Sequence, residues 1–236
     1  MEIVRIAPNL VMLAFPVGHA YLWHGPDGLT LVDTGVPGSG PEIRRAITET
    51  GHRPADLRRV LLTHFHGDHT GSAAEAASWG DVEVVAHALD APMIRGEAAG
   101  PAPVLSDWEQ RLWEQVHTQV PDEPPAPVRV DREVGDGDDI DLGGGVHAVA
   151  VAVPGHTPGS VAYYLPEPRI LFTGDTIARG PDGTVILGVF NADPARAAAS
   201  LRRQAELDTD IACFGHGLPA VGDAAAALRQ AAGSPS

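Results

Sequence analysis

Histidine and aspartate residues gather at the ends of apolar segments in this chain, and this feature limits its fold more than any other. The densest group lies in THFHGDHTG, where His64, His66, Asp68 and His69 follow the apolar run 60–62. Polar side chains that are buried at a strand end without partners cost free energy. Either the fold brings something that binds them, or the segment is a solvated turn rich in histidine.

Three further segments repeat the pattern. VPGHTPGS places His156 after an apolar run, LFTGDT does the same with Asp175, and ACFGHG with His216. Each residue follows a glycine, where the backbone can approach a ligand closely. The repetition argues against a solvated turn. We therefore expect seven side chains to converge at one edge of the predicted sheets: His64, His66, Asp68, His69, His156, Asp175 and His216.

The donor atoms of this set suit a divalent metal. Imidazole nitrogen and carboxylate oxygen without thiolate favour a borderline ion such as zinc. Alternate residues of a strand point to one side, so His64 and His66 can chelate one ion. The chain turns at Gly67, which lets Asp68 and His69 face a neighbouring ion. Seven ligands with one shared carboxylate fit two Zn²⁺ ions better than one.

Two other residues are candidates for the same site. Asp33 ends the apolar strand of LVDTG, and its best role is to accept a hydrogen bond from a ligand histidine and so orient it. A plain turn or capping residue is the alternative. His19, in FPVGHAY, lies on an early hairpin that could reach the site, and it is a candidate for contact with the substrate.

Apolar patterning predicts strands followed by helices, and predicts this order twice. The first half contains strands over 2–35, a helix at 41–50, a strand at 57–64, an alanine-rich helix at 71–79 and a strand at 82–87. The second half contains strands between 128 and 176, a helix that begins at Asp193, a strand at 211–217 and a final helix at 222–233. Two sheets packed face to face with helices outside fit this order, which makes the fold class α/β (α+β).

The segment 88–127 interrupts this rhythm. It is rich in proline, glycine and alanine, and it contains one helix over 106–120 with a capping box at Ser106 and Glu109. Trp108, Leu112 and Val116 share one face of this helix. The segment is either a cover near the site or a helix that packs its tryptophans on the core.

The composition bounds the remaining possibilities. A chain of 236 residues fits one domain spanning 1–236. The net charge is −15 and all 16 basic residues are arginine, which argues against a broad surface for nucleic acid. No window reaches the roughly 18 apolar residues of a membrane span, and we expect no signal peptide. With the single Cys213, these features predict a cytoplasmic protein that takes a small-molecule substrate and leave a homodimer open.

The motifs THFHGDHTG, PGHTPGS, FTGDT and FGHG, together with LVDTG, resemble those of the metallo-β-lactamase fold superfamily. The resemblance covers nearly the whole chain and implies a four-layer αββα sandwich. It also implies that His64, His66 and His156 hold one metal, that Asp68, His69 and His216 hold the second, and that Asp175 bridges them. The spacing is similar to that of the glyoxalase II-like and lactonase-like branches.

The resemblance implies a dinuclear-zinc hydrolase that cleaves a small ester, lactone or thioester by a metal-bridging hydroxide. Asp68 is expected to orient this nucleophile and accept its proton, as well as to bind metal. Glyoxalase II enzymes hold glutathione carboxylates with basic residues, but this chain has no lysine, and Arg179 is the candidate substitute. The lactonase branch is expected to have a tyrosine near the site, and the only tyrosines are Tyr21, Tyr163 and Tyr164.

Two alternatives stay open at this point. Some superfamily members that resemble glyoxalase II oxygenate a persulfide with one Fe²⁺, held by the equivalents of His64 or His66, His156 and Asp175. Two histidines and a carboxylate suit such iron chemistry. The other alternative is a non-catalytic metal-binding member of the fold, although the complete ligand set argues against it.

Overall fold

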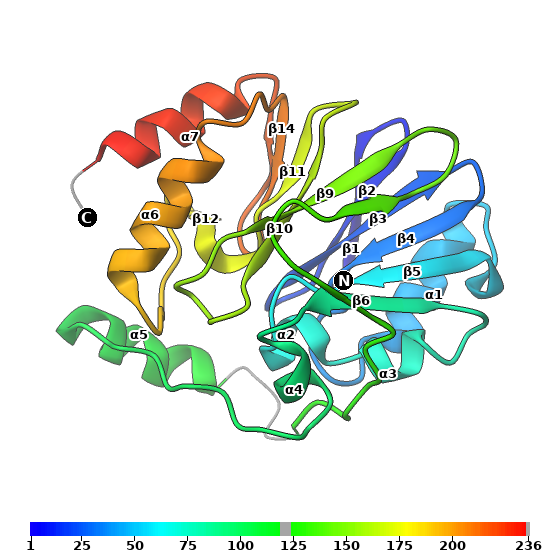
Figure 1. Ribbon diagram of the computed structural model, residues 1–236, viewed down its shortest axis with the longest axis horizontal. Coiled ribbons are helices and arrows are strands. Elements are labelled where there is room, and N and C mark those ends of the chain that lie inside the picture. Colours follow the sequence, from blue (N-terminus) through cyan, green and yellow to red (C-terminus); the bar gives the residue numbers. More distant parts are fainter. Residues whose placement is uncertain (119–123, 235–236) are drawn as a thin grey trace.

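The computed structural model describes residues 1–118 and 124–234. Two β-sheets pack face to face, with helices on both outer sides (Figure 1). The seven strands of the first sheet are adjacent in their sequence order. They are β1 (Glu2–Ala7), β2 (Leu10–Ala14), β3 (His19–Gly25), β4 (Gly28–Val32), β5 (Leu57–Leu61), β6 (Glu83–His87) and β7 (Arg132–Val134).

The second sheet has the strand order β15-β14-β11-β10-β9-β8, and a separate two-stranded hairpin joins β12 and β13. These strands are β8 (Asp139–Asp141), β9 (His147–Ala152), β10 (Val161–Leu165), β11 (Ile170–Phe172), β12 (Ile177–Arg179), β13 (Val185–Leu187), β14 (Ile211–Cys213) and β15 (Ala220–Val221).

The helices differ in where they pack. The longer ones are α1 (Gly40–Glu49), α5 (Asp107–His117), α6 (Pro194–Gln204) and α7 (Ala224–Gly233). Figure 1 shows α6 and α7 outside the second sheet, α1 on the opposite side of the molecule, and α5 below α6. The short helices are η1 (Pro54–Asp56), α2 (Gly67–Thr70), α3 (Ala73–Ala76), α4 (Ala91–Ile94) and η2 (Gly174–Thr176). None of these described helices is long and apolar enough to cross a membrane.

Alternation along each strand produces three separate apolar layers. In β2, Leu10 and Met12 point between the two sheets, while Val11 and Leu13 pack with Ile43 of α1 on the outer face. Residues on the inner face of the second sheet complete the layer between the sheets. A third layer lies between the second sheet and helices α6 and α7. Each layer excludes apolar surface from water, so the sheets and helices stack in the order αββα.

Parallel strand pairs bring the polar clusters together. β4 pairs with β5 in parallel in the first sheet, and β11 pairs with β14 in parallel in the second. The carboxyl ends of parallel strands meet at the same sheet edge. Asp33 and His64 therefore follow one such pair, and Asp175 and His216 follow the other.

Several local features differ from the sequence-based predictions, and the strands expected at 57–64 and 211–217 end earlier, at Leu61 and Cys213. The strand expected at the start of the second half is shorter, and as β7 it pairs with β6 and completes the first sheet. The helix expected over 71–79 is only α3, because a bend at Ser72 separates it from α2. The hairpin of β12 and β13 was not expected, since its strands have only three residues each.

A tyrosine links the two sheets close to the polar edge. Tyr21 of β3 is buried between the sheets, and its hydroxyl donates to the Phe214 carbonyl at 2.7 Å. Phe214 follows β14 and precedes the loop that carries His216. This hydrogen bond therefore connects the first sheet to the loop of a polar-cluster residue in the second.

We expect Tyr21→Phe to lower the free energy of unfolding by about 1–2 kcal/mol, because the buried Phe214 carbonyl loses its donor. Urea unfolding measures the change. The matched control is Tyr164→Phe, whose hydroxyl donates to the Asp208 carbonyl at an exposed position, and its effect should stay within about 0.5 kcal/mol. Equal losses in the two variants would contradict this account of the link.

Candidate metal centre

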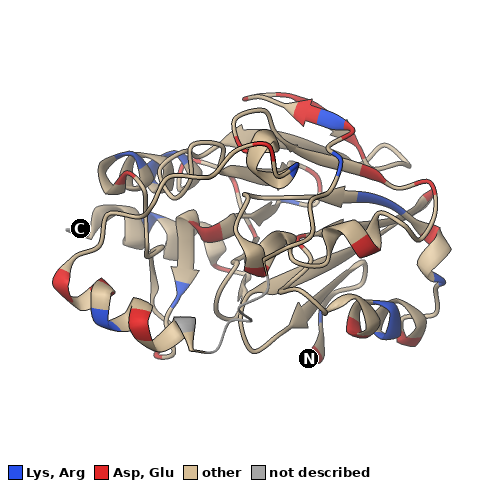
Figure 2. Cartoon of the chain, turned by 90° about the horizontal axis from the view of Figure 1, so that it is seen from below, with Lys and Arg blue, Asp and Glu red and all other residues tan. Residues whose placement is uncertain are grey.

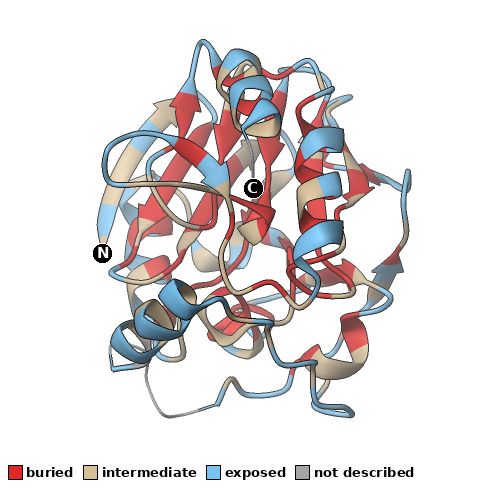
Figure 3. Ribbon diagram, turned by 90° about the vertical axis from the view of Figure 1, so that its left-hand side faces the viewer, coloured by how far each residue is buried: buried red, intermediate tan, exposed pale blue. Residues whose placement is uncertain are grey.

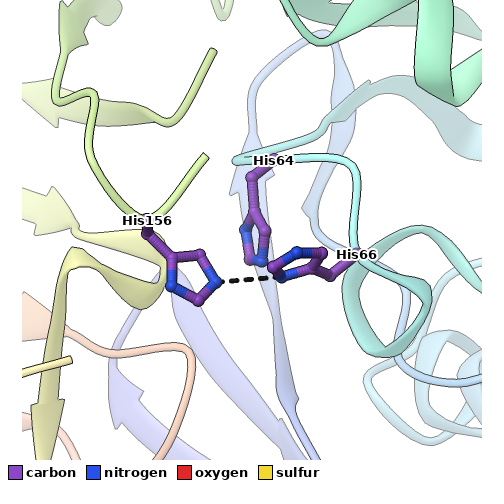
Figure 4. Close-up of side chains that lie close together, drawn as sticks. All are labelled: His64, His66 and His156. Carbon is purple, nitrogen blue, oxygen red and sulfur yellow. Dashed lines mark hydrogen bonds between the residues drawn. The ribbon is translucent and has the colours of Figure 1, made fainter. Parts of the chain in front are cut away.

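Three histidines form the first cluster. His64 follows β5, His66 precedes the first residue of α2, and His156 lies in the loop after β9. Their ring centroids stand 4.7 Å from one another, and His156 Nε2 lies 2.9 Å from His66 Nδ1. Figure 4 shows the three rings converging from two sides. One nitrogen from each ring can therefore bind a single ion.

Two carboxylates and two histidines form the second cluster. Asp68 and His69 lie in α2, Asp175 in η2 after β11, and His216 after β14. His216 Nε2 is 3.1 Å from Asp175 Oδ2 and 3.3 Å from Asp68 Oδ2. His69 Nε2 is 3.2 Å from Asp175 Oδ1. The four donor atoms surround one point, as the ligands of one ion do.

Asp175 lies between the two clusters. Its Oδ2 atom is 3.7 Å from His156 Nε2 and 4.0 Å from His64 Nε2, in addition to its short distance to His216. Gly215 leaves room for this carboxylate, since a Cβ atom at Gly215 would collide with it. The structure thus brings all seven side chains predicted from the sequence to one edge of the two sheets.

Burial and charge act differently on the two clusters. Burial lowers the pKa of His66 to about 3, with a further contribution from His156, and burial also lowers the pKa of His64 and of His156. These neutral rings offer lone pairs to a cation. Burial acts in the same direction on His216, but the carboxylates of Asp175 and Asp68 raise its pKa to about 10. The second cluster therefore favours positive charge.

Several buried side-chain nitrogen and oxygen atoms at the centre make no hydrogen bond. They include His64 Nε2, His69 Nε2 and Asp175 Oδ1. Unsatisfied polar atoms at buried positions cost free energy. A cation among them would satisfy all three, so the residues present fit a metal ion.

Asp33 sets the tautomers of two histidines, one in each cluster. His69 Nδ1 donates to Asp33 Oδ2 at 2.9 Å, so its Nε2 atom keeps a lone pair. Thr63 Oγ1 donates to the same oxygen at 2.8 Å and lies 3.0 Å from His64 Nδ1. Since the only Thr63 hydroxyl proton is directed at Asp33, His64 Nδ1 donates to Thr63 and its Nε2 also keeps a lone pair.

Asp90 was not singled out from the sequence, yet it joins the two loops of the first cluster. It is buried, and it accepts from Phe65 N at 3.1 Å, Thr157 Oγ1 at 2.6 Å and Gly159 N at 2.6 Å. Phe65 lies between two of the cluster histidines, and Thr157 follows the third. Burial raises the pKa of Asp90 to about 6. Asp90 follows the sequence HAL, residues 87–89, which contains no motif that predicts a carboxylate joining two loops.

His19 lies beside the second cluster but does not line the pocket described below. Burial lowers its pKa to about 4, with a further contribution from His216. Its Nδ1 atom is buried and makes no hydrogen bond. The preceding Gly18 has a φ of 69° and packs against the Asp68 carbonyl, where a Cβ atom would lie 2.7 Å from that oxygen. Contact of His19 with a substrate stays a prediction.

A pocket of about 390 Å³ opens over the metal centre. Its floor contains five of the predicted ligands, and its walls come from helix α5, the loop after β13 and Val17. Leu112 and Val116 line it as part of the face predicted from the sequence, but the tryptophan there is Trp113, while Trp108 is 53% exposed outside the pocket. Residues 119 and 120 of the predicted helix lie outside the described residues.

No tyrosine hydroxyl faces this pocket. Tyr21 donates to Phe214, Tyr163 donates to the Leu62 carbonyl at 3.0 Å, and Tyr164 donates to Asp208. The Arg179 guanidinium is directed elsewhere as well, since it donates to the carbonyls of Gly183 and Pro219 at 2.8 Å each. Neither sequence-based candidate for substrate recognition, a tyrosine or Arg179, lines the pocket.

Comparison with known proteins shows a consistent likeness. A sequence profile described as the metallo-beta-lactamase superfamily matches residues 14–216. The probable metallo-hydrolase YflN of Bacillus subtilis (strain 168) is 26% identical over 222 residues, which cover 84% of this chain and 78% of that protein. The hydroxyacylglutathione hydrolase of Rhodobacter capsulatus is 29% identical over 199 residues, which cover 84% of this chain and 61% of that enzyme. The chain thus spans about three fifths of the length of this relative.

Solved structures show the same fold. A HARLDQ-motif mutant of the metallo-beta-lactamase from Cronobacter sakazakii superposes with a TM-score of 0.71 at 25% identity, and the match covers 91% of this chain and 78% of that one. A metallo-beta-lactamase family protein from Thermus thermophilus gives a TM-score of 0.70 at 24% identity, with 96% and 79% covered. The αββα fold predicted from the sequence is confirmed, and the relatives support the prediction of a metal-dependent hydrolase.

We expect Asp33→Asn to weaken metal binding about 10- to 100-fold, because the carboxylate that orients His69 and His64 loses its charge. Asparagine suits the left-handed backbone at this position, where φ is 58°. Competition with a chromogenic chelator measures the affinity. The control is Asp139→Asn, which removes an exposed carboxylate 2.7 Å from His147 Nδ1, and it should leave the affinity unchanged. Identical affinities in both variants would show that Asp33 does not support the metal.

Proposed function

Because the chain belongs to the metallo-beta-lactamase superfamily, we propose that it is a dinuclear zinc hydrolase that cleaves a small ester, lactone or thioester. The observation that carries this proposal is the pair of donor clusters that share Asp175. A single ion bound by the three histidines of the first cluster would leave the four side chains of the second cluster without a role as ligands. Two ions with a carboxylate between them use every donor.

Each ligand has a definite atom in this proposal. His64 Nε2, His66 Nδ1 and His156 Nε2 would hold the first ion. Asp68, His69 Nε2 and His216 Nε2 would hold the second, and Asp175 would serve both. Zinc in such a site supplies a Lewis acid that lowers the pKa of water toward neutrality and stabilises the oxyanion of a tetrahedral intermediate.

Of the two carboxylates of the centre, Asp68 is the better placed to handle a proton. It lines the pocket, and its side chain is 19% exposed, against 12% for Asp175. Asp68 thus orients the attacking water from the side on which substrate enters. The carboxylate then accepts the proton of that water and passes it to the leaving group.

Water is the nucleophile in this mechanism, and no protein nucleophile replaces it. The single cysteine, Cys213, is buried between the sheets, and burial raises the pKa of its thiol well above the usual value. A neutral thiol in the core cannot attack a substrate in the pocket. The scissile carbonyl reaches the centre through the pocket beneath α5, so α5 covers the site on one side, and a covering role for the whole segment 88–127 stays a prediction.

Persulfide oxygenation by one iron is the second candidate. His64 or His66, His156 and Asp175 lie close enough to form a site of two histidines and one carboxylate, which is the observation that favours it. The four donors of the second cluster favour the dinuclear hydrolase.

A single domain over 1–236, a cytoplasmic location and a homodimer stay predictions. Figure 2 shows arginines and acidic residues intermixed over the described ribbon, which is consistent with a small-molecule substrate.

We expect protein purified without added metal to contain about two zinc ions per chain, because the two clusters offer seven donors. Plasma mass spectrometry measures the metal content. Removal of zinc by a chelator should abolish ester hydrolysis, and added zinc should restore it. About one iron per chain, with oxygen consumption on glutathione persulfide, would instead establish the second candidate.

We expect His64→Ala combined with His66→Ala to lower kcat/KM by at least about 100-fold, because the first ion loses two of its three imidazole ligands. Hydrolysis assays and metal content measure the effect. The matched control is His24→Ala with His52→Ala, which removes another imidazole pair, 3.1 Å apart and half-buried at the far end of β3. Unchanged turnover in the first variant would exclude the proposed mechanism.

A further inference from the structure

We propose that the pocket wall formed by α5 and Phe190 binds an uncharged hydrocarbon group of the substrate, and that Glu109 holds this wall in position. The inference rests on the proposed hydrolase function, because it names the class of substrate for the same site. We use the term α5 wall for Leu112, Trp113, Val116 and Phe190. The expected substrate is thus a neutral ester or lactone with an aliphatic or aromatic substituent.

The first observation is the chemistry of the pocket lining. Apart from the residues of the metal centre, the described lining consists of glycine, alanine and large apolar side chains. The chain has no lysine, and no arginine lines the described part of the pocket. An anionic substrate group on this wall would therefore lose its hydration without gaining a partner, which is costly.

The second observation is that α5 does not bury its apolar residues in the protein core. Leu112, Trp113 and Val116 are only half-buried, and none belongs to the three buried layers of the fold. By contrast, α1 and α6 both contribute buried residues to those layers. In Figure 3, α5 shows only exposed and intermediate residues. Its apolar face is instead turned to the pocket, where a bound hydrocarbon group would cover it.

The third observation is a carboxylate that fastens α5 to the loop that carries Phe190. Glu109 Oε2 accepts from Ser106 N at 2.9 Å, which is one half of the predicted capping box, and it also accepts from Ser106 Oγ at 2.6 Å. Glu109 Oε1 accepts from Phe190 N at 3.1 Å. The Glu109 side chain therefore caps α5 and also accepts a hydrogen bond from the backbone of the loop that carries Phe190.

The loop itself is held in an unusual conformation by this contact. Phe190 has a φ of 60°, in the left-handed region that non-glycine residues rarely adopt. Its ring stands 5.0 Å from the Trp113 ring at right angles, so the two aromatic side chains form one continuous surface. A second link, from Val104 N to the Asn191 carbonyl at 2.9 Å, supports the same contact. Glu109 is thus a positioning residue that acts through the aromatic pair.

The first experiment uses the zinc-loaded full chain and para-nitrophenyl esters of increasing acyl length. Because each buried methylene contributes roughly fourfold in binding, we expect kcat/KM to rise at least about tenfold from acetate to hexanoate, chiefly through KM. The ester of glutaric acid, whose chain ends in a free carboxylate, should react no better than the acetate. A flat series, or faster cleavage of the carboxylate-ended ester, would overturn the proposal.

Matched variants assign the effect to the wall. Trp113→Ala should flatten the series, whereas Trp108→Ala, an exposed tryptophan of the same helix, should leave it steep. Glu109→Ala should raise KM for the hexanoate at least about fivefold with little change for the acetate. Glu109→Gln, which keeps an acceptor oxygen, should restore most of the loss. The control Glu114→Ala removes an exposed glutamate of the same helix, which accepts from Gln110 at 3.0 Å.

A binding measurement separates this proposal from the proposed function. Methyl hexyl ketone is a neutral probe that is not hydrolysed, and its binding to the zinc-loaded chain is followed by tryptophan fluorescence. We expect it to bind at least about tenfold more tightly than methyl ethyl ketone, with the signal lost in Trp113→Phe. If no ester is cleaved but the ketones bind in this way, the hydrolase function fails and the apolar wall stands. If the acetate is cleaved and the two ketones bind equally, the wall proposal is wrong.

Discussion

The Asp175 carboxylate is the point on which the rest of the structure depends. It lies between a cluster of three imidazoles and a cluster of two imidazoles with a second carboxylate. Such a concentration of donor atoms at a buried position is unfavourable unless cations occupy it, because the donors otherwise lack partners. A metal centre would therefore account for the convergence of the loops that carry these residues. These loops follow β5, β9, β11 and β14, and they meet where the two sheets present the same edge.

The loops are held by groups that do not bind metal. Asp33 joins the first sheet to a histidine of each cluster and settles which ring nitrogen carries the proton. Asp90 joins the two loops of the first cluster, and Tyr21 joins the sheets beside the loop of His216. All three are buried and hydrogen-bonded, so they hold the geometry before an ion or a substrate arrives. The support of the centre therefore comes from strands and from buried side chains.

The site combines two environments. Its floor is polar and suited to cations, and the α5 wall above it is apolar and only half-covered by the protein. The floor determines the kind of reaction, since polarisation of a carbonyl and activation of water need the metal. The α5 wall selects among the molecules that bind above the floor, because its side chains are apolar. A family likeness to hydroxyacylglutathione hydrolases therefore does not carry their substrate with it, because the metal centre does not determine the chemistry of the wall.

The sequence by itself determined which polar residues meet at the candidate metal centre, and it determined the layered fold. Alternation in segments such as 10–14 predicts which faces are buried, and the motifs around His64, His156, Asp175 and His216 predict which strand ends meet, since both signals are local. Contacts between distant segments were decided only by the tertiary structure. Three such contacts join residues that are far apart in sequence: β7 pairs with β6, Asp90 accepts three hydrogen bonds, and Glu109 accepts from Phe190 N. The side of α5 from which Trp113 lines the pocket was also decided by the packing of the whole fold. No local pattern records these contacts, because they arise when the two sheets and α5 pack together.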